Sequence, residues 1–578
     1  MFDSLKKHFK GDIDTSDATL RLYSHDASLF EIRPEVVVFP KDSEDVQALV
    51  TWVRDNKRQY PHLSITARAA GTCMSGGSIN DSIIMDTTRY MNQIISVTRL
   101  ARPCTIKPKF EGSQDVTVVG EARVQPGCFY RDFEAETLKQ DLLLPCYTAS
   151  KSLNAVGGMI GNNSGGELTL KYGKTEDYVR ELKVVLTDGH EYTFGPITRR
   201  ELYSKITEPT LEGLVYKQMF ELIKDHESLI NGSKPHVSKN SAGYMLWHVL
   251  TRGATEDEDV FDLAQLIVGS QGTLGIVTEI VFKLVEKQKK SKLLVTFLPD
   301  FSKVGEIANE LLQTNPESIE SYDDKTFKLA LKFFTDFLKL KGFWGALKFT
   351  LSFLPEFWML LTGGIPKMVL MTEYAGDTEE EIQQKCVAGM EKIKHFGFKA
   401  RITKSENEAE KYWDMRRDSF SLLRKHVQGM RTAPFIDDII VRPEFLSEFL
   451  PKVNALIAEY PSLIYTIAGH AENGNFHIIP LVDPNDPKLP DIIIKLSQQV
   501  YSLTLSYHGS ITAEHNDGII RSPFLPQMYG AEMYDLFVRT KFIFDPQTIF
   551  NPKKKVGVTQ EDIKKYLVQP HKDTPHAS

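Results

Sequence analysis

Residues 68–77 have the sequence RAAGTCMSGG, a glycine-rich stretch between two short apolar runs. We predict β-strands for these runs, Leu63–Ala67 and Ser82–Asp86. Glycine adopts positive φ at little cost, so successive backbone N–H groups of such a loop can converge on an anion. The stretch matches neither G-x-x-x-x-G-K-[ST] nor G-x-G-x-x-G, which excludes the P-loop and Rossmann interpretations. A diphosphate suits the loop best, although most glycine-rich turns between strands bind nothing.

Two further glycine clusters strengthen the case for a ligand. They are residues 155–166 (AVGGMIGNNSGG) and residues 269–277 (GSQGTLGIV). Upstream, Pro34–Pro40 predicts a strand, and Ser43–Lys57 predicts a helix because its apolar residues recur at helical spacing after an acidic first turn. The alternation of strands and helices indicates an α+β fold, and three backbone-rich loops in one domain suit a large ligand.

Length and composition limit the classes of protein to which this chain can belong. Its 578 residues exceed one hydrophobic core, so we expect two domains, with a boundary near the basic run Lys287–Lys292. The net charge of −7 gives no basic field, so no nucleic-acid partner is expected. The five cysteines are odd in number and include no C-x-x-C pair, which argues against a disulfide framework or an iron–sulfur cluster.

The sequence also bears on location. Residues 1–10 lack the apolar segment of a secretory signal, and no run of 18 apolar residues occurs, so we expect a cytoplasmic protein. Residues 325–361 interleave lysines with Phe, Leu and Trp. The stronger interpretation of this stretch is a solvated helix face. The alternative is a peripheral contact with the inner face of the membrane, near a quinone.

Together the three loops resemble the FAD-binding domain of the vanillyl-alcohol-oxidase-like, PCMH-type flavoproteins. The nearest branch contains D-lactate dehydrogenase, the glycolate oxidase flavin subunit and D-2-hydroxyglutarate dehydrogenase, and the resemblance extends from about Tyr23 to Val556. It implies a two-subdomain FAD-binding domain followed by an FAD-linked oxidase C-terminal α+β cap domain with an antiparallel sheet. The implied divisions are an N-terminal segment (1–22), the FAD-binding domain (23–286), the substrate and metal domain (287–557, with an amphipathic insertion at 323–364) and a tail (558–578).

By this resemblance the loops hold FAD non-covalently. Residues 68–77 would bind the diphosphate, Pro145 and residues 150–166 would line the flavin, and residues 271–277 would support the adenosine part or the ring edge. Asn551 matches an Asn-Pro pair that reaches back to the flavin. Ala69 and Ala70 stand where relatives carry glycine, which would strain the loop if those positions need positive φ. The implied FAD contacts are Arg68, Ala69, Ala70, Gly71, Thr72, Cys73, Ser75, Gly76, Gly77, Pro145, Ser150, Gly157, Gly158, Asn162, Asn163, Gly165, Gln271, Gly272, Gly275, Ile276, Val277 and Asn551.

A histidine-bearing hairpin is predicted further along the chain. Residues 463–468 and 476–479 are apolar strand-like runs, and the Asn473-Gly474 pair between them is a strong hairpin signal. If this pair is a two-residue loop, His470 faces His477 and the two imidazoles could bind one metal ion. Glu514 is the best candidate for a third ligand. For this segment alone, the simpler interpretation is that the two histidines lie on a half-buried hairpin and bind no ligand.

The family resemblance favours the metal site. Residues 470–477 resemble an H-x-G-D-G-N-x-H motif, with Glu472 and Asn473 in place of Gly-Asp, and Glu514-His515 resembles the family's Glu-His. It implies that His470, His477 and Glu514 bind a divalent metal, Zn or Mn. Asn475 would contact the substrate or flavin, and His515 would be the catalytic base. Two imidazoles and a carboxylate leave coordination positions open, as a catalytic metal requires.

Arg416 matches the family's W-x-x-R, and the resemblance implies that it binds the substrate carboxylate. Without the resemblance, an ordinary surface arginine is an equal interpretation. Residues 435–438 (FIDD) depart from the animal D-2-hydroxyglutarate dehydrogenases, which have a lysine shortly before an Asp. Recognition of a second, distal carboxylate is therefore in doubt.

These residues predict an FAD-dependent dehydrogenase that oxidises a D-2-hydroxy acid, such as D-lactate, glycolate or D-2-hydroxyglutarate, to the 2-oxo acid. The electron acceptor would be a quinone, an electron-transfer flavoprotein or a separate iron–sulfur subunit. Three alternatives stay open: a metal-dependent hydrolase built on the histidine hairpin, a non-redox flavin-dependent transferase of the same superfamily, and a catalytically silent binding module.

Overall fold

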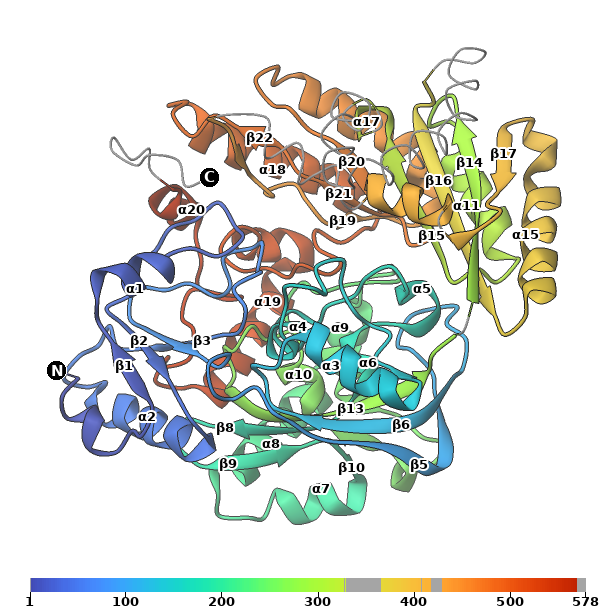
Figure 1. Cartoon of the computed structure of the whole chain (residues 1–578). Coiled ribbons are helices and arrows are strands. Elements are labelled where there is room, and N and C mark those ends of the chain that lie inside the picture. The colour runs from blue at the N-terminus through green and yellow to red at the C-terminus, as the bar shows by residue number, and fades with distance from the viewer. Residues whose placement is uncertain are drawn as a thin grey trace. The chain divides into compact units, whose positions relative to one another are not determined.

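The structure, a computed structural model, describes residues 2–288, 290–326, 328, 365–406, 408–416 and 429–568. The chain divides into two compact units (Figure 1). Unit 1 consists of residues 1–236, 240–287 and 511–578, and unit 2 consists of residues 237–239 and 288–510. Unit 2 is thus inserted in the sequence of unit 1.

The first sheet of unit 1 carries the glycine-rich loop 68–77. Its strand order is β1-β2-β4-β3, with β2, β4 and β3 parallel and β1 antiparallel at the edge. The helix α2 begins where predicted, because the Asp42 side chain accepts a hydrogen bond from the Asp45 backbone N–H. Its apolar face packs into the core beneath the sheet. The bounds are β1 Asp12–Asp14, β2 Val36–Phe39, β3 Ile65–Arg68, β4 Ile83–Asp86, α1 Asp17–Leu22 and α2 Ser43–Asn56.

Antiparallel sheets make up the rest of the strand structure in the described part of unit 1. The larger has the order β5-β6-β13-β8-β9, with β7 also paired to β13, and the smaller has the order β10-β12-β11. The strands are β5 Ile94–Ile106, β6 Val116–Val124, β7 Leu142–Leu143, β8 Val179–Val185, β9 Glu191–Phe194, β10 Pro196–Thr198, β11 Leu250–Thr251, β12 Val260–Asp262 and β13 Ile276–Glu286. The helices are α3 Tyr130–Thr137, α4 Val156–Asn162, α5 Thr169–Tyr172, α6 Thr175–Tyr178, α7 Arg199–Lys205, α8 Leu211–Asp225, α9 Glu227–Gly232, α10 Ala264–Ile267, α19 Leu525–Phe544 and α20 Gln560–Tyr566.

The C-terminal segment of the chain packs into unit 1. Phe550 forms a parallel bridge with Ile65 beside β3, and the Asn551 backbone N–H donates to the Ile65 carbonyl at 2.8 Å. The buried Lys541 ammonium donates to the carbonyls of Thr273 and Phe550. The predicted boundary near residue 287 coincides with a change of unit, but residues 511–557, which sequence analysis assigned to the second domain, belong to the first compact unit.

Unit 2 is built on one antiparallel sheet with the order β17-β14-β16-β15-β20-β21-β19, and β18 pairs separately with β22. Helix α15 packs against β14 and β16, and α17 packs against α18. The strands are β14 Lys290–Leu298, β15 Ser318–Asp323, β16 Met368–Gly376, β17 Lys399–Ile402, β18 Arg431–Thr432, β19 Ile439–Ile440, β20 Ile467–His470, β21 Asn475–Ile478 and β22 Leu481–Val482. The helices are α11 Val304–Leu312, α15 Glu379–Ile393, α17 Leu446–Ala458 and α18 Leu489–Ser506.

The register of the histidine hairpin differs from the prediction. In β20 and β21, His470 pairs with Asn475, and Ala468 pairs with His477. The connection is therefore residues 471–474 rather than Asn473-Gly474 alone. It is stabilised by successive turn hydrogen bonds from Asn473 N–H to His470 O and from Gly474 N–H to Ala471 O, and Gly474 takes a φ of 70°. The two histidines are diagonal neighbours on one face of the hairpin, which keeps them within reach of each other.

The lysine-rich stretch 325–361 lies largely outside the described residues, since 329–364 are not described. Its predicted helix and membrane contact therefore stay predictions. Within the described ranges, no helix combines the length and the apolar character needed to cross a membrane.

Candidate functional site

The glycine-rich loop 68–77 adopts the backbone geometry expected of an anion-binding loop. Gly71 and Gly76 have φ values of 69° and 80°, in the left-handed region that favours glycine. Ala69 and Ala70, both described, lie outside that region. The replacement of family glycines by these alanines therefore introduces no backbone strain.

Gln271 joins the three glycine loops. Its side-chain amide donates to Ser75 Oγ and to Asn162 Oδ1, both at 3.2 Å, and its Oε1 accepts from the Gly518 backbone N–H at 2.8 Å. Its backbone N–H donates to Gly161 O. The loops around residues 75, 162 and 271 are thus held in one fixed arrangement.

Asn551, in the C-terminal segment, forms hydrogen bonds with two of these loops. Its side-chain amide donates to Gly77 O at 2.8 Å and to Gln271 O at 2.7 Å, while its Oδ1 accepts from the Thr66 hydroxyl at 3.0 Å. The side chain is fully buried. Asn551 therefore uses both ends of its amide to hold the loops together.

Several glycines leave space in front of these loops. A β-carbon added at Gly158 would meet only Ala69 Cβ, at 3.8 Å, and one added at Gly272 would meet only Ala67 Cβ, at 3.7 Å. By contrast, a β-carbon at Gly157 would clash with the backbone of Pro126. Gly157 is needed for packing, whereas the backbone at Gly158 and Gly272 is open on the side where a β-carbon would lie.

Several other residues that were predicted to contact FAD take part in strand pairing, packing or hydrogen bonding within unit 1. Ile276 and Val277 begin β13 and pair with β8, and a β-carbon at Gly275 would lie 2.6 Å from a side-chain atom of Val184. Asn163 bonds Glu176 through both ends of its amide. The part of these residues in FAD binding stays a prediction.

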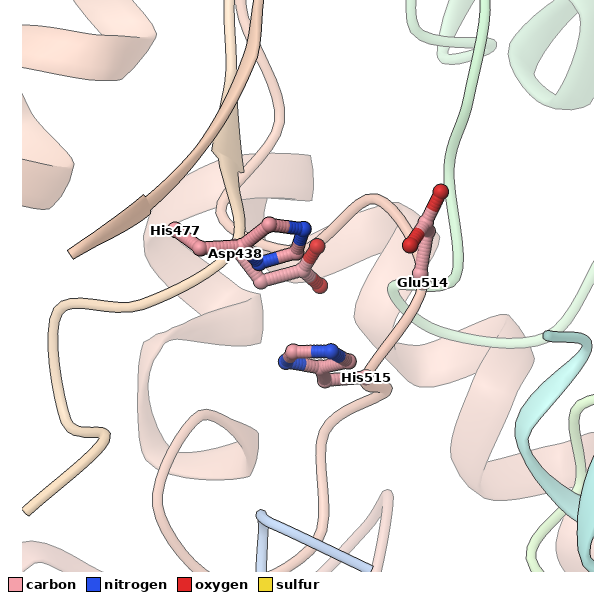
Figure 2. Close-up of side chains that lie close together, drawn as sticks. All are labelled: Asp438, His477, Glu514 and His515. Carbon is pink, nitrogen blue, oxygen red and sulfur yellow. The ribbon is translucent and has the colours of Figure 1, made fainter. Parts of the chain in front are cut away.

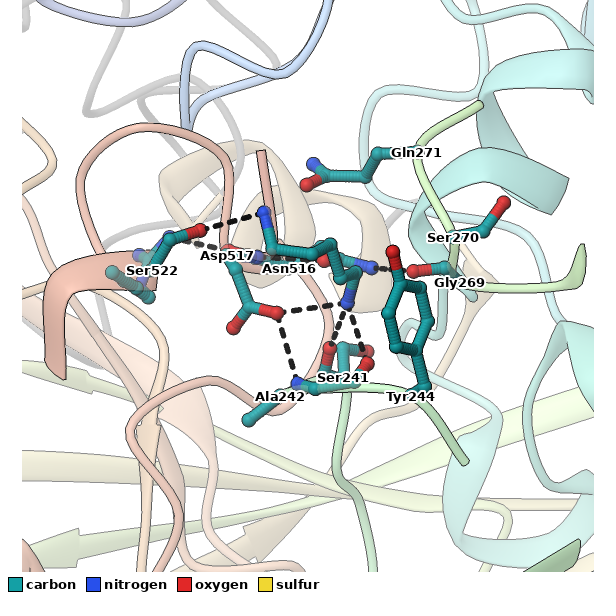
Figure 3. Close-up of polar contacts among 12 residues, drawn as sticks. Ser241, Ala242, Tyr244, Gly269, Ser270, Gln271, Asn516, Asp517 and Ser522 are labelled. Carbon is teal, nitrogen blue, oxygen red and sulfur yellow. Dashed lines mark hydrogen bonds and ion pairs between the residues drawn. The ribbon is translucent and has the colours of Figure 1, made fainter. Parts of the chain in front are cut away.

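A buried polar network supports residues 511–518 (Figure 3). Asn516 donates to Asn162 O at 3.1 Å and to Gly269 O at 2.9 Å, while Asp517 forms an ion pair with Lys555 at 2.8 Å. The Lys555 ammonium also donates to the carbonyl of Gly243. Residues 511–518 are therefore bonded to two of the glycine-rich loops.

Glu514 and His515 lie on this supported loop, in unit 1. A β-carbon added at Gly165 would be 3.1 Å from Glu514 Oε1, so the buried Glu514 carboxylate lies against the glycine cluster 155–166. The preceding carbonyl, Ala513 O, accepts from the buried Lys174 ammonium at 2.6 Å. Both side chains are drawn in Figure 2.

In unit 2 each hairpin histidine is held by a buried carboxylate. His470 Nδ1 lies 2.6 Å from Glu320 Oε1, and His477 Nδ1 lies 3.2 Å from Asp437 Oδ1. The two imidazole rings are 5.4 Å apart between centroids. With Nδ1–H donating to the carboxylate, Nε2 of each ring carries the lone pair, which is the usual state of a metal-binding histidine.

Glu320 stands at the centre of a buried charged cluster. It forms an ion pair with Arg416 as well as contacting His470. Burial alone would raise the pKa of Glu320, but the charge of Arg416 and the hydrogen bond with His470 lower it to about 2. Burial and the charge of Glu320 raise the pKa of the nearby Glu472 to about 7. Glu320, His470 and Glu472 offer ligand atoms within 4.8 Å of one another.

The structure gives two other predicted residues a clear position in unit 2. Asn475 is buried and donates to Asp438 Oδ1 at 3.2 Å and to Ile439 O at 3.3 Å. Arg416 ends a described helical stretch, and its side chain is 7% exposed. It is therefore not the ordinary surface arginine of the plainer interpretation.

Sequence analysis missed the carboxylates that hold the histidines. Glu320 occupies a fully buried position of β15, in the run SIESYD, and Asp437 is fully buried as well. The run SIESYD contains two acids and two serines, so no signal in the sequence indicated that Glu320 is buried and therefore needs a partner.

Two family models match the chain. The model of the FAD binding domain matches residues 34–195, and the model of the C-terminal domain of FAD linked oxidases matches residues 287–555. The chain belongs to the FAD-linked oxidases. FAD is accordingly the cofactor of this FAD-linked oxidase, and the predicted two-domain α+β fold is confirmed.

Named relatives and solved structures agree with this family. The chain is 28% identical over 550 residues to a D-2-hydroxyglutarate dehydrogenase of Pseudomonas putida, covering 94% of this chain and 50% of that protein. The chain thus spans about half the length of that curated relative. It is 25% identical to the glycolate oxidase subunit GlcD of Bacillus subtilis, covering 94% and 93%. A structure of p-cresol methylhydroxylase with substrate bound shares the fold, with a TM-score of 0.62 at 15% identity, covering 97% and 96% of the two chains.

Proposed function

We propose that this FAD-linked oxidase is a dehydrogenase that oxidises a small D-2-hydroxy acid to the 2-oxo acid. The names of the relatives support the reaction class. The observation that carries the proposal is the pair of histidines, His470 and His477, each with Nδ1 held by a buried carboxylate. This arrangement is typical of metal-ligating imidazoles, and hydroxy acids chelate metals through their hydroxyl and carboxylate oxygens.

The proposed metal ligands are His470, His477 and Glu514, with zinc or manganese as the metal. Bound FAD supplies a two-electron acceptor, and the divalent cation supplies Lewis acidity toward the substrate hydroxyl. His515 takes the hydroxyl proton as general base. Glu514 lies against the glycine cluster 155–166, which supports a metal close to the flavin.

Arg416 is proposed to bind the substrate carboxylate. A guanidinium carries five N–H donors in a planar fork, so its ion pair with Glu320 is compatible with a second carboxylate partner. Glu320 then orients both Arg416 and His470. Asn475, which Asp438 holds by a hydrogen bond, would contact the substrate or the flavin.

The substrate is proposed to carry a single carboxylate. Where some relatives have a lysine shortly before an Asp, residues 435–438 of this chain read FIDD and contain no lysine. A second substrate carboxylate would therefore lack that cation and would face buried acids, Asp437 and Asp438. D-lactate and glycolate are therefore better candidates than D-2-hydroxyglutarate.

Anaerobic titration of the purified protein with a panel of D-2-hydroxy acids tests the proposal. Loss of flavin absorbance near 450 nm, on the order of one equivalent of substrate per flavin, is expected for D-lactate or glycolate. The matched L-enantiomers serve as controls. Loss of the response after chelation, with recovery on adding Zn²⁺ or Mn²⁺, would support the metal. A flavin that no hydroxy acid reduces would rule out the dehydrogenase and favour the non-redox transferase.

A further inference from the structure

Three consecutive lysines follow the Asn551-Pro552 pair, and two of them have clear partners. The Lys553 ammonium donates to Asp562 Oδ1 at 2.6 Å, and its side chain is 49% exposed. The fully buried Lys555 forms an ion pair with Asp517 and donates to two backbone carbonyls. Both lysines are satisfied by the fold of unit 1.

Lys554 differs from its neighbours. It is 2% exposed, yet its ammonium makes no hydrogen bond or ion pair with any residue in the described ranges. Burying an ammonium group without a partner is costly, and such a group in a native fold calls for an explanation. Burial lowers the pKa of Lys554 to about 8, even though the charges of Asp26 and Asp81 act in the opposite direction.

Lys554 lies beside the end of the glycine-rich loop. Asn551 bonds Gly77 O, and Asn80 donates to Pro552 O at 3.4 Å, so the backbone before Lys554 follows residues 77–80. Among the acids, Asp26 has the largest effect on the pKa of Lys554, and its carboxylate accepts hydrogen bonds from Ser28 and Ser78. Asp26 thus already has its own hydrogen-bond donors at the end of this loop.

The other cation of the loop, Arg68, is engaged in protein contacts. It donates to His25 O at 2.7 Å and its guanidinium lies 5.0 Å from the centre of the Tyr23 ring. The loop itself offers backbone N–H groups, which are dipoles and bring no full countercharge. A diphosphate bound there would still lack a cation dedicated to it.

We propose that Lys554 binds the diphosphate of FAD, as the cation that complements the backbone N–H groups of residues 71–77. The inference rests on the proposed binding of the FAD diphosphate at this loop. Lys554 would be a positioning residue for the cofactor and takes no part in the chemistry. A ligand with two negative charges explains a buried amine that the protein itself leaves without a partner.

The test compares four proteins: wild type, Lys554→Met, Lys554→Arg and the neighbouring control Lys553→Met. FAD and riboflavin affinities are measured by flavin fluorescence on apoprotein in the absence of substrate. Lys554→Met should weaken FAD binding about 10- to 100-fold, as expected for losing a charge-assisted contact, and leave riboflavin binding unchanged because riboflavin has no diphosphate. Lys554→Arg and Lys553→Met should stay within a few-fold of wild type.

The pH dependence of FAD affinity is a second test, because a lysine with only a structural role would not change it. Wild-type affinity for FAD should fall as pH rises above about 8, where the free amine loses its proton, whereas Lys554→Met should be flat over that range. Unchanged FAD affinity in Lys554→Met overturns the proposal, as does an equal loss of riboflavin affinity. If Asp26→Asn restores FAD affinity to the Lys554→Met protein, the lysine serves Asp26 and the proposal fails. None of these experiments measures hydroxy acid oxidation. A failure of the proposed dehydrogenase activity can therefore be distinguished from a failure of the proposal for Lys554.

Discussion

Replacing Asn551 by Asp tests whether the C-terminal segment holds the glycine-rich loops 68–77 and 269–277 together. The side chains have nearly the same shape, but Asp cannot donate the two hydrogen bonds that Asn551 gives to Gly77 O and Gln271 O. Each lost bond is worth about 1 kcal/mol net. A carboxylate oxygen would then face two buried carbonyl oxygens, which raises the pKa of the new Asp in the folded state.

That pKa shift sets the size and pH dependence of the effect. If the folded pKa rises from about 3.9 to 7 or above, the destabilisation at pH 7 reaches about 4 kcal/mol, at about 1.4 kcal/mol per pH unit. The sign follows from linkage. Because the folded pKa is raised, the penalty is absent below the unfolded pKa of about 3.9 and grows as pH rises toward the folded pKa. Asn551→Asp should therefore be more stable at pH 5 than at pH 7, relative to wild type.

The assay is release of FAD fluorescence and loss of far-UV dichroism in urea, at pH 5 and pH 7. Asn92→Asp is the matched control, because the Asn92 amide also donates to a backbone carbonyl but is exposed. We expect Asn551→Asp to release FAD at a lower urea concentration, with the larger difference at pH 7. Wild-type stability at both pH values would refute the role assigned to Asn551.

Three further predictions concern the proposed metal and base. His477→Ala should keep FAD bound but abolish its reduction by substrate, and wild-type reduction would show that the hairpin is only structural. His515→Ala should retain metal and FAD while slowing anaerobic flavin reduction by about 10²–10⁴-fold, with a residual rate that rises with pH, and a stopped-flow rate equal to wild type would exclude it as the base. Asp437→Asn should lower metal affinity about 10- to 100-fold in chelator competition, because it loosens the hold on His477, whereas the exposed Asp483→Asn should leave that affinity unchanged.

The sequence predicted the local elements of unit 1 well because their signals are local. The run around Val36–Phe39 is apolar and β-branched, and the helix after Asp42 has a capping residue followed by apolar residues at helical spacing. The glycine-rich loop between β3 and β4 was likewise evident from composition. In each case the residues that decide the structure are neighbours in the chain.

Long-range partners were not predictable in the same way. Glu320 is 150 positions from His470, and no local pattern links the two. The predicted register of the hairpin was wrong. The Asn473-Gly474 pair favours a two-residue loop, whereas the observed turn has four residues, with Gly474 in the αL conformation. The free ammonium of Lys554 was hidden too, since all three lysines of the triplet look alike in sequence.

The position of Asn551 has a consequence for how the protein is made. On a ribosome, residues 65–77 and 271–277 emerge hundreds of residues before the segment that joins them. Unit 2 is synthesised in between and, being contiguous apart from residues 237–239, can fold first. Until Lys541 and Asn551 have left the exit tunnel, the loops lack the hydrogen bonds that these two residues donate to Thr273 O and Gly77 O. Loading of FAD should therefore be one of the last events of biosynthesis, and a chain cut short before residue 541 should accumulate without flavin.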